Sequence, residues 1–391
     1  MPRRNFHNIA AVRDAARRRL PLPVWDFLEG GAEDEYTLRR NTAAFDLFHL
    51  NPRTLLDVSN IDLTTRVLGQ SVSMPLMLAP TGASGLWRPA GEAAAARAAA
   101  EAGIFYGLST GSTLSLEDVA SVGAGPRMFQ LYAFKDQSIN EALIERSRDA
   151  GFQALCLTID AAAGAGNRER DTRNGMSPGQ RMSLRSLASI ALHPSWAFGA
   201  WLGGGTRLGS IESLMPKGPH SLQDVRAFLM KEMTTSMTWK DAEKIAASWH
   251  GPFAVKGAMS VEDARNAVAI GANAIIVSNH GGRQLDGVSS TIEALPAILD
   301  EVGDAAEVIL DSGVRRGSHI VKALALGAKA VMVGRPYLYG LAANGEDGVR
   351  TVIDIFRAEL KKTMALAGAT RIDELDASFV HPAMASREAR L

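Results

Sequence analysis

The chain has 391 residues, and 46% of them are hydrophobic, which is enough apolar surface to form a core and excludes general disorder. Its 42 basic and 42 acidic residues cancel, which argues against nucleic acid as the main partner. A single cysteine excludes a disulfide framework and a cysteine-based zinc site, so no metal centre is expected. No apolar signal segment follows the N-terminus, which favours a cytoplasmic protein.

Residues 1–73 are expected to form helices and a lead-in to the main fold. Beyond them, short apolar runs of strand type alternate with amphipathic helical segments. The predicted strands are residues 76–79, 104–108, 128–132, 154–159, 253–256, 274–278, 307–310 and 330–333. The clearest helical segments between them are residues 91–102, 137–150, 261–270 and 317–326. This alternation indicates an α/β protein with a parallel sheet, and eight strands are the number that closes a (β/α)₈ barrel.

The barrel is expected to occupy residues 74–370 of one domain, with a tail at 371–391. Glycines end four of the helices just before a strand, where a left-handed residue is typical. They are Gly103, Gly151, Gly271 and Gly327.

One connection, residues 161–249, is much longer than a usual strand-to-helix loop and is predicted to cross the barrel mouth. Within it, residues 186–206 carry no charge and include Trp196 and Trp201. Pro194 and the glycines at 203–205 argue against a membrane-spanning helix. Two interpretations stay open: peripheral contact with a membrane, or a loop packed on its own protein.

Polar residues and glycines gather where the predicted strands end, which is the face that carries the active site in such barrels. This convergence is hard to explain as packing. The residues are Pro80, Thr81, Gly82, Ser109, Gln130, Tyr132, Thr158, Asp160, Lys256, Ser278, His280, Arg283, Asp311, Gly313, Arg315, Gly334 and Arg335.

The last two strand ends predict a phosphate-binding site. Gly313 and Gly334 allow close approach of the backbone, and Arg315 and Arg335 supply a charge whose forked geometry matches phosphate oxygens. The alternative is a pair of tight turns with surface arginines.

His280 at the end of the sixth strand is a candidate general base, because histidine titrates near neutral pH. Asp160 is its candidate partner, and Arg283 is a candidate anion-binding group. A structural histidine and a helix-capping aspartate are the simpler alternatives. Lys256 ends an apolar strand, where it would either face an anionic cofactor or form a Schiff base.

Residues 278–286 (SNHGGRQLD) resemble the signature of the FMN-dependent 2-hydroxy acid oxidoreductases, a family that includes glycolate oxidase, lactate oxidase and dehydrogenases, and mandelate dehydrogenase. The resemblance runs from about residue 6 to 367, and its other motifs follow in the family's order. They are residues 30–35, 79–82, 129–132, 255–257, 311–317 and 322–328 with 334–336. Residues 79–82, 167–171 and 338–343 are most similar to the mandelate dehydrogenase branch.

The resemblance implies that FMN is the cofactor and assigns residues to each of its parts. Pro80, Thr81 and Gly82 would contact the flavin near its reactive nitrogen, and Ser109, Gln130 and Thr158 would bond the ring. Lys256 would lie by the pyrimidine side, which displaces the Schiff-base interpretation. The remaining contacts would be Ser278 on the flavin, Asp311 on the ribityl chain, and Gly313, Arg315, Gly334 and Arg335 on the phosphate.

The implied reaction is oxidation of an (S)-2-hydroxy acid, of mandelate or lactate type, to the 2-oxo acid. His280 would be the base with Asp160 as partner, Arg283 and Arg168 would bind the carboxylate, and Tyr132 would bond the substrate oxygen. Hydride and carbanion routes both stay open. The electron acceptor is oxygen, a quinone or a carrier protein, and the resemblance implies a homotetramer. In the mandelate branch, membrane association runs through the segment that corresponds to residues 186–206.

Glycine at Gly82 and Gly111 leaves room near the flavin for a phenyl ring. Two departures from the family pattern stand against this assignment. Phe27 replaces a tyrosine that normally bonds the substrate carboxylate, a loss of about 1.5–3 kcal/mol. The stretch from Asp160 to Arg168 is one residue longer than usual. These departures keep open a repurposed member that acts on a larger substrate, and an FMN-dependent non-redox isomerase is a further alternative.

Overall fold

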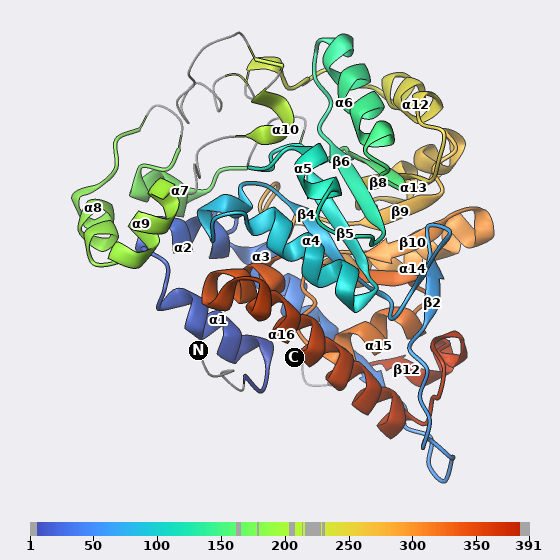
Figure 1. Ribbon diagram of the computed structural model, residues 1–391. Coiled ribbons are helices and arrows are strands. Elements are labelled where there is room, and N and C mark those ends of the chain that lie inside the picture. Colours follow the sequence, from blue (N-terminus) through green and yellow to red (C-terminus); the bar gives the residue numbers. More distant parts are fainter. Residues whose placement is uncertain are drawn as a thin grey trace, which may run out of the picture.

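The computed structural model describes residues 6–161, 166–177, 180–202, 208–212, 214–215, 228 and 231–383. Eight parallel strands form a closed barrel at its centre, with helices around it (Figure 1). The strands follow one another in chain order, and β11 pairs with β4 to close the ring. They are β4 (Leu76–Thr81), β5 (Phe105–Ser109), β6 (Arg127–Leu131), β7 (Ala154–Thr158), β8 (Phe253–Ala258), β9 (Ala274–Val277), β10 (Glu307–Leu310) and β11 (Ala330–Val333).

The predicted (β/α)₈ barrel is therefore confirmed. Its strands read as continuous apolar runs because helices cover one face and the barrel interior covers the other. Side chains that point inward form a cluster of their own, which includes Met77, Phe105, Cys156 and Met332. The hairpin of β2 (Thr65–Val67) and β3 (Gln70–Val72) adds side chains to this cluster. The interior is thus a packed core, which leaves the strands' carboxyl ends as the open face.

The helices around the barrel match the sequence prediction to within a residue where one was made. They are α4 (Gly91–Ala102), α5 (Leu116–Ala120), α6 (Gln137–Asp149), α12 (Trp239–Ser248), α13 (Val261–Ala269), α14 (Thr291–Val302), α15 (Gly317–Ala325) and α16 (Arg335–Ala367). The four glycines expected to end helices all have positive φ, between 68° and 113°. This confirms their predicted left-handed conformation.

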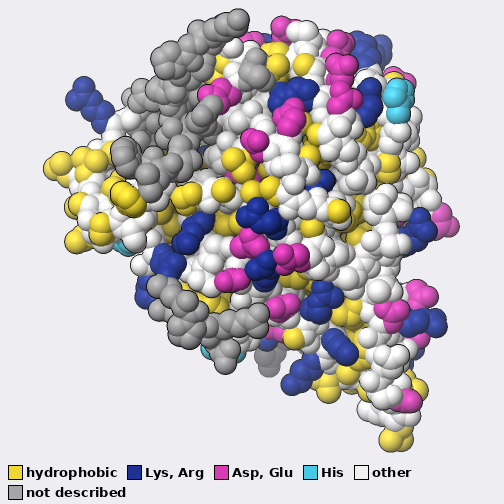
Figure 2. All heavy atoms as spheres, viewed as in Figure 1, with side chains coloured by type: hydrophobic (Ala, Val, Ile, Leu, Met, Phe, Trp, Pro, Cys, Tyr) yellow, Lys and Arg dark blue, Asp and Glu magenta, His cyan; other side chains and the backbone are white. Residues whose placement is uncertain are grey.

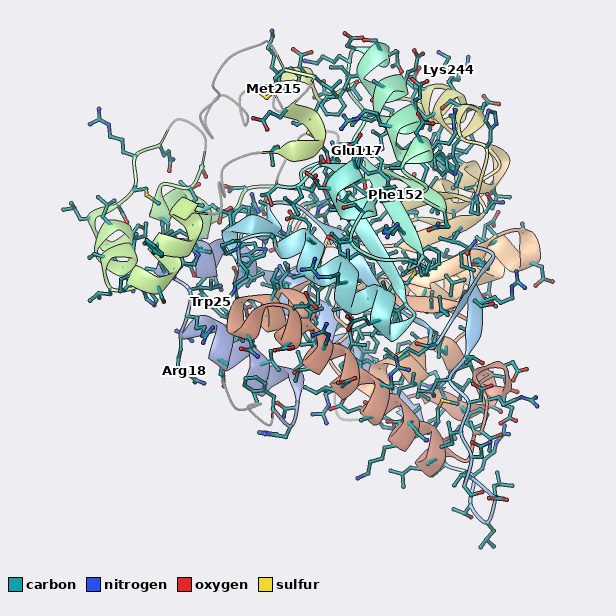
Figure 3. All side chains as sticks on the ribbon, in the orientation of Figure 1. Arg18, Trp25, Glu117, Phe152, Met215 and Lys244 are labelled. Atoms are coloured by element: carbon teal, nitrogen blue, oxygen red, sulfur yellow. The ribbon has the colours of Figure 1, made fainter. Side chains whose placement is uncertain are left out.

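The lead-in begins with helices, as predicted, and continues into short strands that the sequence did not indicate. Its helices bring residues to the barrel mouth. Its elements are α1 (Ile9–Arg17), α2 (Leu22–Glu29), α3 (Tyr36–Ala43) and the short η1 (Ala44–Leu47), followed by β1 (Phe48–Leu50), which pairs with β12 (Val380–Pro382) near the other end of the chain. Trp25, labelled in Figure 3, lies on α2. Its ring stacks on that of Tyr339 of α16, with ring centroids 6.1 Å apart. This contact anchors α2 where it reaches the mouth.

The long connection after β7 includes, ahead of α12, the helices α7 (Glu169–Asn174), α8 (Leu184–Ala191), α9 (Pro194–Leu202) and α10 (Gly209–Glu212). Pro194 begins α9, so it separates two short helices, as expected of a helix-breaking residue at a first turn. Within the described ranges, no helix combines the length and apolarity needed to cross a membrane. The glycines at 203–205 lie outside the described residues.

Helices α8 and α9 agree in part with each interpretation of this segment, packing on its own protein and contact with a membrane. The indole N–H of Trp196 donates to the Leu86 carbonyl at 2.8 Å, so this tryptophan is packed on its own protein. In contrast, Leu184, Leu192 and Phe198 expose 85%, 80% and 62% of their surface. Figure 2 shows hydrophobic side chains gathered over this projecting end of the molecule. We call Leu184, Leu187, Leu192 and Phe198 the α8–α9 patch.

Candidate active site

A cavity of about 560 Å³ opens at the carboxyl ends of the strands, within the range of ordinary ligand sites. Residues 166–177 of the long connection and the end of α2 complete its wall. Most of the predicted site residues line it, namely Phe27, Pro80, Thr81, Gly82, Tyr132, Arg168, Lys256, His280, Arg283, Asp311, Gly313, Arg315, Gly334 and Arg335. The others lie buried behind them or beside them.

His280 and Asp160 form a hydrogen-bonded pair, with His280 Nδ1 3.1 Å from Asp160 Oδ1. Burial alone would raise the pKa of Asp160, but the neighbouring His280 and Lys256 more than offset this and hold it below its usual value. The carboxylate is therefore ionised and can only accept, so Nδ1 of His280 carries the proton. In the neutral imidazole, Nε2 then carries the lone pair, and it faces the hydroxyl of Tyr132 at 3.3 Å. This tautomer is the one a general base requires.

The backbone of His280 is left-handed, with φ 57°, a conformation that costs a non-glycine residue about 1–3 kcal/mol. The next two residues, both glycine, continue the turn with φ 67° and 73°. Neighbouring side chains hold the turn in place: Ser278 Oγ accepts from the His280 N–H, and Ser312 Oγ accepts from the Gly281 N–H. The turn aims the imidazole into the cavity.

Lys256 of β8 belongs to a buried network with Ser278 and Asp311. Its Nζ lies 2.9 Å from both Ser278 Oγ and Asp311 Oδ2, and Ser278 Oγ donates to the same carboxylate oxygen at 2.7 Å. Burial favours the neutral amine, but the charges of Asp311 and Asp160 outweigh it and raise the pKa of Lys256. A permanently charged lysine is unsuited to Schiff-base formation and suited to stabilising negative charge.

Ser109 at the end of β5 and Gln130 at the end of β6 are buried, and together they leave one N–H donor of Gln130 available to a ligand. Ser109 Oγ donates to Gln130 Oε1 at 2.8 Å, and Gln130 Nε2 is fully buried without a hydrogen-bond partner among the described residues. An orphaned buried donor costs about 1–3 kcal/mol, so it marks a place where a ligand acceptor fits. Thr158 lies beside Lys256 in the strand register, and it lines a smaller neighbouring cavity with Tyr132.

The ends of β10 and β11 meet as predicted. Gly313 has φ 80°, and a Cβ there would lie 1.9 Å from the Asn41 carbonyl, so only glycine fits. Gly334 has free space in front of its Cα, where the nearest atom to an added Cβ would be 3.6 Å away. Arg315 lines the cavity next to Gly313. Backbone access and a guanidinium together suit a phosphate.

Arg335 differs from the sequence expectation in what its guanidinium contacts. It donates to three backbone carbonyls, those of Leu28, Gly30 and Gly281, at 2.9–3.1 Å. It thus ties the end of α2 to the turn that carries His280, while it still lines the cavity. Burial lowers its pKa, and the nearby Arg315 adds to this, so a neighbouring anion would stabilise its charge.

Two arginines lie on the ring of Phe27. The Cζ atoms of Arg168 and Arg283 are 4.8 and 5.2 Å from its centroid, and its other neighbour is Trp87, stacked at 5.8 Å. Arg283 also donates to the Phe27 carbonyl at 2.8 Å, and Arg168 pairs with Asp171 at 3.1 Å. The longer stretch before Arg168 therefore does not keep it from the cavity. Burial and the charge of Arg168 push the pKa of Arg283 well below its usual value. An anion bound beside the two arginines would stabilise their charges.

Sequence reasoning missed three contributors. Trp87 supports Phe27 but follows a strand end without any distinguishing pattern. Glu92 is fully buried and accepts the backbone N–H groups of Ser84 and Thr113, which fixes the loop after β4; a first-turn glutamate gives no sign of this. Asn41 contacts the residue before His280, and only long-range structure reveals it.

The residues fit FMN: the orphaned amide of Gln130 and the charged Lys256 suit a flavin ring, and the Gly313–Arg315 end suits its phosphate. A barrel with these features is that of a flavin-binding oxidoreductase. A family model described as FMN-dependent dehydrogenase matches residues 16–382, so the chain belongs to that family and uses FMN.

The chain is similar to L-lactate dehydrogenase of Pseudomonas syringae pv. syringae (strain B728a), with 42% identity over 95% of this chain and 98% of the relative. It is 43% identical to L-lactate dehydrogenase of Chromohalobacter salexigens over 93% and 92%. Among solved structures, a monotopic membrane protein, (S)-mandelate dehydrogenase, aligns with a TM-score of 0.92 and 39% identity over 97% and 100% of the two chains. A mandelate oxidase with (S)-2-phenylpropionate aligns at 0.80 with 35% identity, over 97% and 99%.

Proposed function

We propose that this FMN-dependent hydroxy acid dehydrogenase oxidises an (S)-2-hydroxy acid with an aromatic side chain, of mandelate type, to the 2-oxo acid. The observation that carries the proposal is that His280, backed by Asp160, lines one cavity with Tyr132 and the two arginines. A base and two arginines in one cavity are what a hydroxy acid needs. The preference for an aromatic side chain is supported by the apolar wall of Phe27, Trp87 and Met176 and by the mandelate-active structural neighbours.

Arg283 and Arg168 bind the substrate carboxylate in this proposal. Both guanidiniums are held by protein groups on one side, which fixes their direction before substrate enters. Preorganised donors orient the substrate as well as bind it, and this positioning lowers the barrier to reaction. Tyr132 donates its hydroxyl to the substrate oxygen, and its pKa, which burial and the charge of Asp160 raise to about 12, keeps it protonated.

His280 removes the substrate hydroxyl proton at Nε2. The imidazolium that forms is stabilised by Asp160, whose carboxylate already accepts the Nδ1 proton. Bound FMN supplies the acceptor for the two electrons. Gln130, Lys256 and the loop at Thr81 would hold its ring, and the ends of β10 and β11 would hold its phosphate.

The test is anaerobic mixing of the FMN-loaded protein with (S)-mandelate, (R)-mandelate and (S)-lactate, followed by flavin absorbance. We expect fast bleaching with (S)-mandelate, slower bleaching with (S)-lactate and none with the (R) acid. His280→Ala should keep bound FMN but lose bleaching by orders of magnitude, whereas Arg315→Ala should weaken FMN retention. Persistent colour of the wild-type protein with every 2-hydroxy acid would refute the proposed function.

We also propose that the α8–α9 patch contacts a membrane surface peripherally. The support is its four exposed apolar side chains and the monotopic description of the (S)-mandelate dehydrogenase neighbour. Leu184→Glu with Phe198→Glu should reduce sedimentation with phospholipid vesicles and leave anaerobic flavin reduction unchanged. Oxygen and quinone added separately after reduction would identify the electron acceptor.

A further inference from the structure

The lead-in helix α3 delivers a buried amide to the turn that carries His280. Asn41 of α3 and Asn279, which precedes His280, are 2% and 5% exposed. Their side chains bond reciprocally: Asn41 Nδ2 donates to Asn279 Oδ1 at 2.8 Å, and Asn279 Nδ2 donates to Asn41 Oδ1 at 2.7 Å. Such a closed pair satisfies both buried amides, which would otherwise be costly.

The amide of Asn279 can adopt only one orientation in this pair. Its Oδ1 also accepts from the Gly282 N–H at 3.2 Å, and its Nδ2 also donates to the Ser289 carbonyl at 3.2 Å. A flip would place a donor against donors on one side and an acceptor against acceptors on the other. Asn41 therefore holds an oxygen under the Gly282 N–H, which is where the left-handed turn of residues 280–282 closes.

This turn has to be held, because left-handed backbone at His280 is strained. Ser278 and Ser312 support its first two N–H groups, and Asn279 supports the third through both its backbone and its side-chain oxygen. If the third support is lost, the strain can relax by rotating His280 away from Asp160. The position of the base thus depends on a residue 238 positions earlier in the chain than Asn279.

Helix α3 is itself fixed on the same segment. Asp286 accepts the backbone N–H groups of Tyr36 and Thr37 at its start, and Arg40 pairs with Glu293. The backbone of Asn41 also lies against Gly313 of the phosphate loop. That second contact uses the carbonyl and not the side chain, so the two roles of this residue can be separated by mutation.

We propose that Asn41 is a positioning residue for the general base: through Asn279 its amide fixes the direction of His280, and with it the contact with Asp160 that selects the tautomer. The proposal rests on the proposed function, in which His280 is the base. Asn41 is not among the described residues that line the cavity. Removing the amide should therefore slow proton removal while FMN and substrate still bind.

The test compares Asn41→Ala and Asn41→Asp with a matched control, Gln153→Ala. Gln153 makes two side-chain bonds to backbone at the opposite end of the barrel, to the Arg127 N–H and the Gly151 carbonyl. For both Asn41 variants, we expect the limiting rate of anaerobic flavin reduction to fall about 10- to 100-fold, as for a small misplacement of a catalytic group. FMN and substrate dissociation constants should stay within about twofold, because backbone contacts at Gly313 remain. The control should lose thermal stability and keep the wild-type rate.

Asn41→Asp guards against simple unfolding, because it preserves volume and one bond but sets an oxygen against Asn279 Oδ1. A readout independent of turnover is the ¹⁵N spectrum of labelled histidine, assigned with His280→Ala. Wild type should show His280 protonated at Nδ1, and the Asn41 variants should show a mixture of tautomers. Folded Asn41 variants with the wild-type rate and tautomer would overturn the proposal. A wild-type flavin that no 2-hydroxy acid reduces would instead refute the proposed function, and the tautomer comparison would still decide the role of Asn41.

Discussion

The carboxylate of Asp160, which follows β7, accepts the Nδ1 proton of His280, which follows β9, at 3.1 Å. This one contact determines which ring nitrogen faces the cavity. The pair is largely shielded from water, and the low pKa of Asp160 keeps the contact charge-assisted.

Asp160→Asn should therefore lower the rate of flavin reduction about 10²- to 10⁴-fold, because an amide can donate to Nδ1 and stabilise the wrong tautomer. FMN affinity should change little. The measurement is anaerobic stopped-flow absorbance with saturating (S)-mandelate. A rate within about threefold of wild type would mean that Asp160 does not orient the base.

Tyr132 offers a pH prediction. Because its pKa is raised to about 12, its hydroxyl remains protonated through the working range. Tyr132→Phe should lower the reduction rate about tenfold, the cost of one lost bond of about 1.4 kcal/mol, without changing the shape of the pH–rate profile between pH 6 and pH 10. Disappearance of an alkaline limb in the variant would show instead that Tyr132 itself titrates there.

The fold could be predicted from the sequence because each strand and helix has a recognisable local pattern. Each barrel strand is a short apolar run, and glycines such as Gly103 end the helices next to it. The candidate site followed from topology alone, since parallel strands in a barrel end on one face. That rule placed His280 and Arg315 in one cavity without knowledge of any contact.

Contacts between segments that are distant in the chain could not be predicted from the sequence. The Asn41–Asn279 pair, the stack of Phe27 on Trp87 and the carbonyl contacts of Arg335 all join lead-in residues to the barrel. None has a local pattern, because asparagine, phenylalanine and arginine in a helix or a loop are ordinary. Arg335 is an example: the sequence predicted that it lies at the cavity, but not that it donates to the carbonyls of Leu28, Gly30 and Gly281.

The buried Lys256–Asp311 pair should make the stability of the protein depend on both residues and on pH. Lys256→Met should destabilise the protein by about 3–5 kcal/mol, because it leaves a buried carboxylate without its partner. Asp311→Asn added to it should restore much of this loss but not normal flavin reactivity. The measurements are urea unfolding and the flavin reduction potential. Full stability of the single variant would contradict the pairing.

The pH dependence of the same pair follows from the direction of the shift. In wild type, Lys256 outweighs burial and lowers the pKa of Asp311, so the folded state favours the ionised carboxylate. Its contribution is present above the ordinary aspartate range near pH 4 and is lost as pH falls through the lower folded pKa. In the double variant, this part of the acid destabilisation should be absent.

Phe27 provides the sharpest test of substrate recognition. Phe27→Tyr should add a hydroxyl beside Arg168 and Arg283, the proposed carboxylate-binding residues, and tighten (S)-mandelate binding about tenfold, as one hydrogen bond to a charged group allows. Phe27→Leu is the control: it keeps the apolar wall but removes the ring under both guanidiniums, which should weaken binding and leave the limiting rate nearly unchanged. The substrate dissociation constant from anaerobic titration of flavin reduction separates the outcomes. If the tyrosine variant binds more weakly than wild type, the pocket has no room for the hydroxyl, and a substrate that fills this space differently from mandelate becomes the better hypothesis.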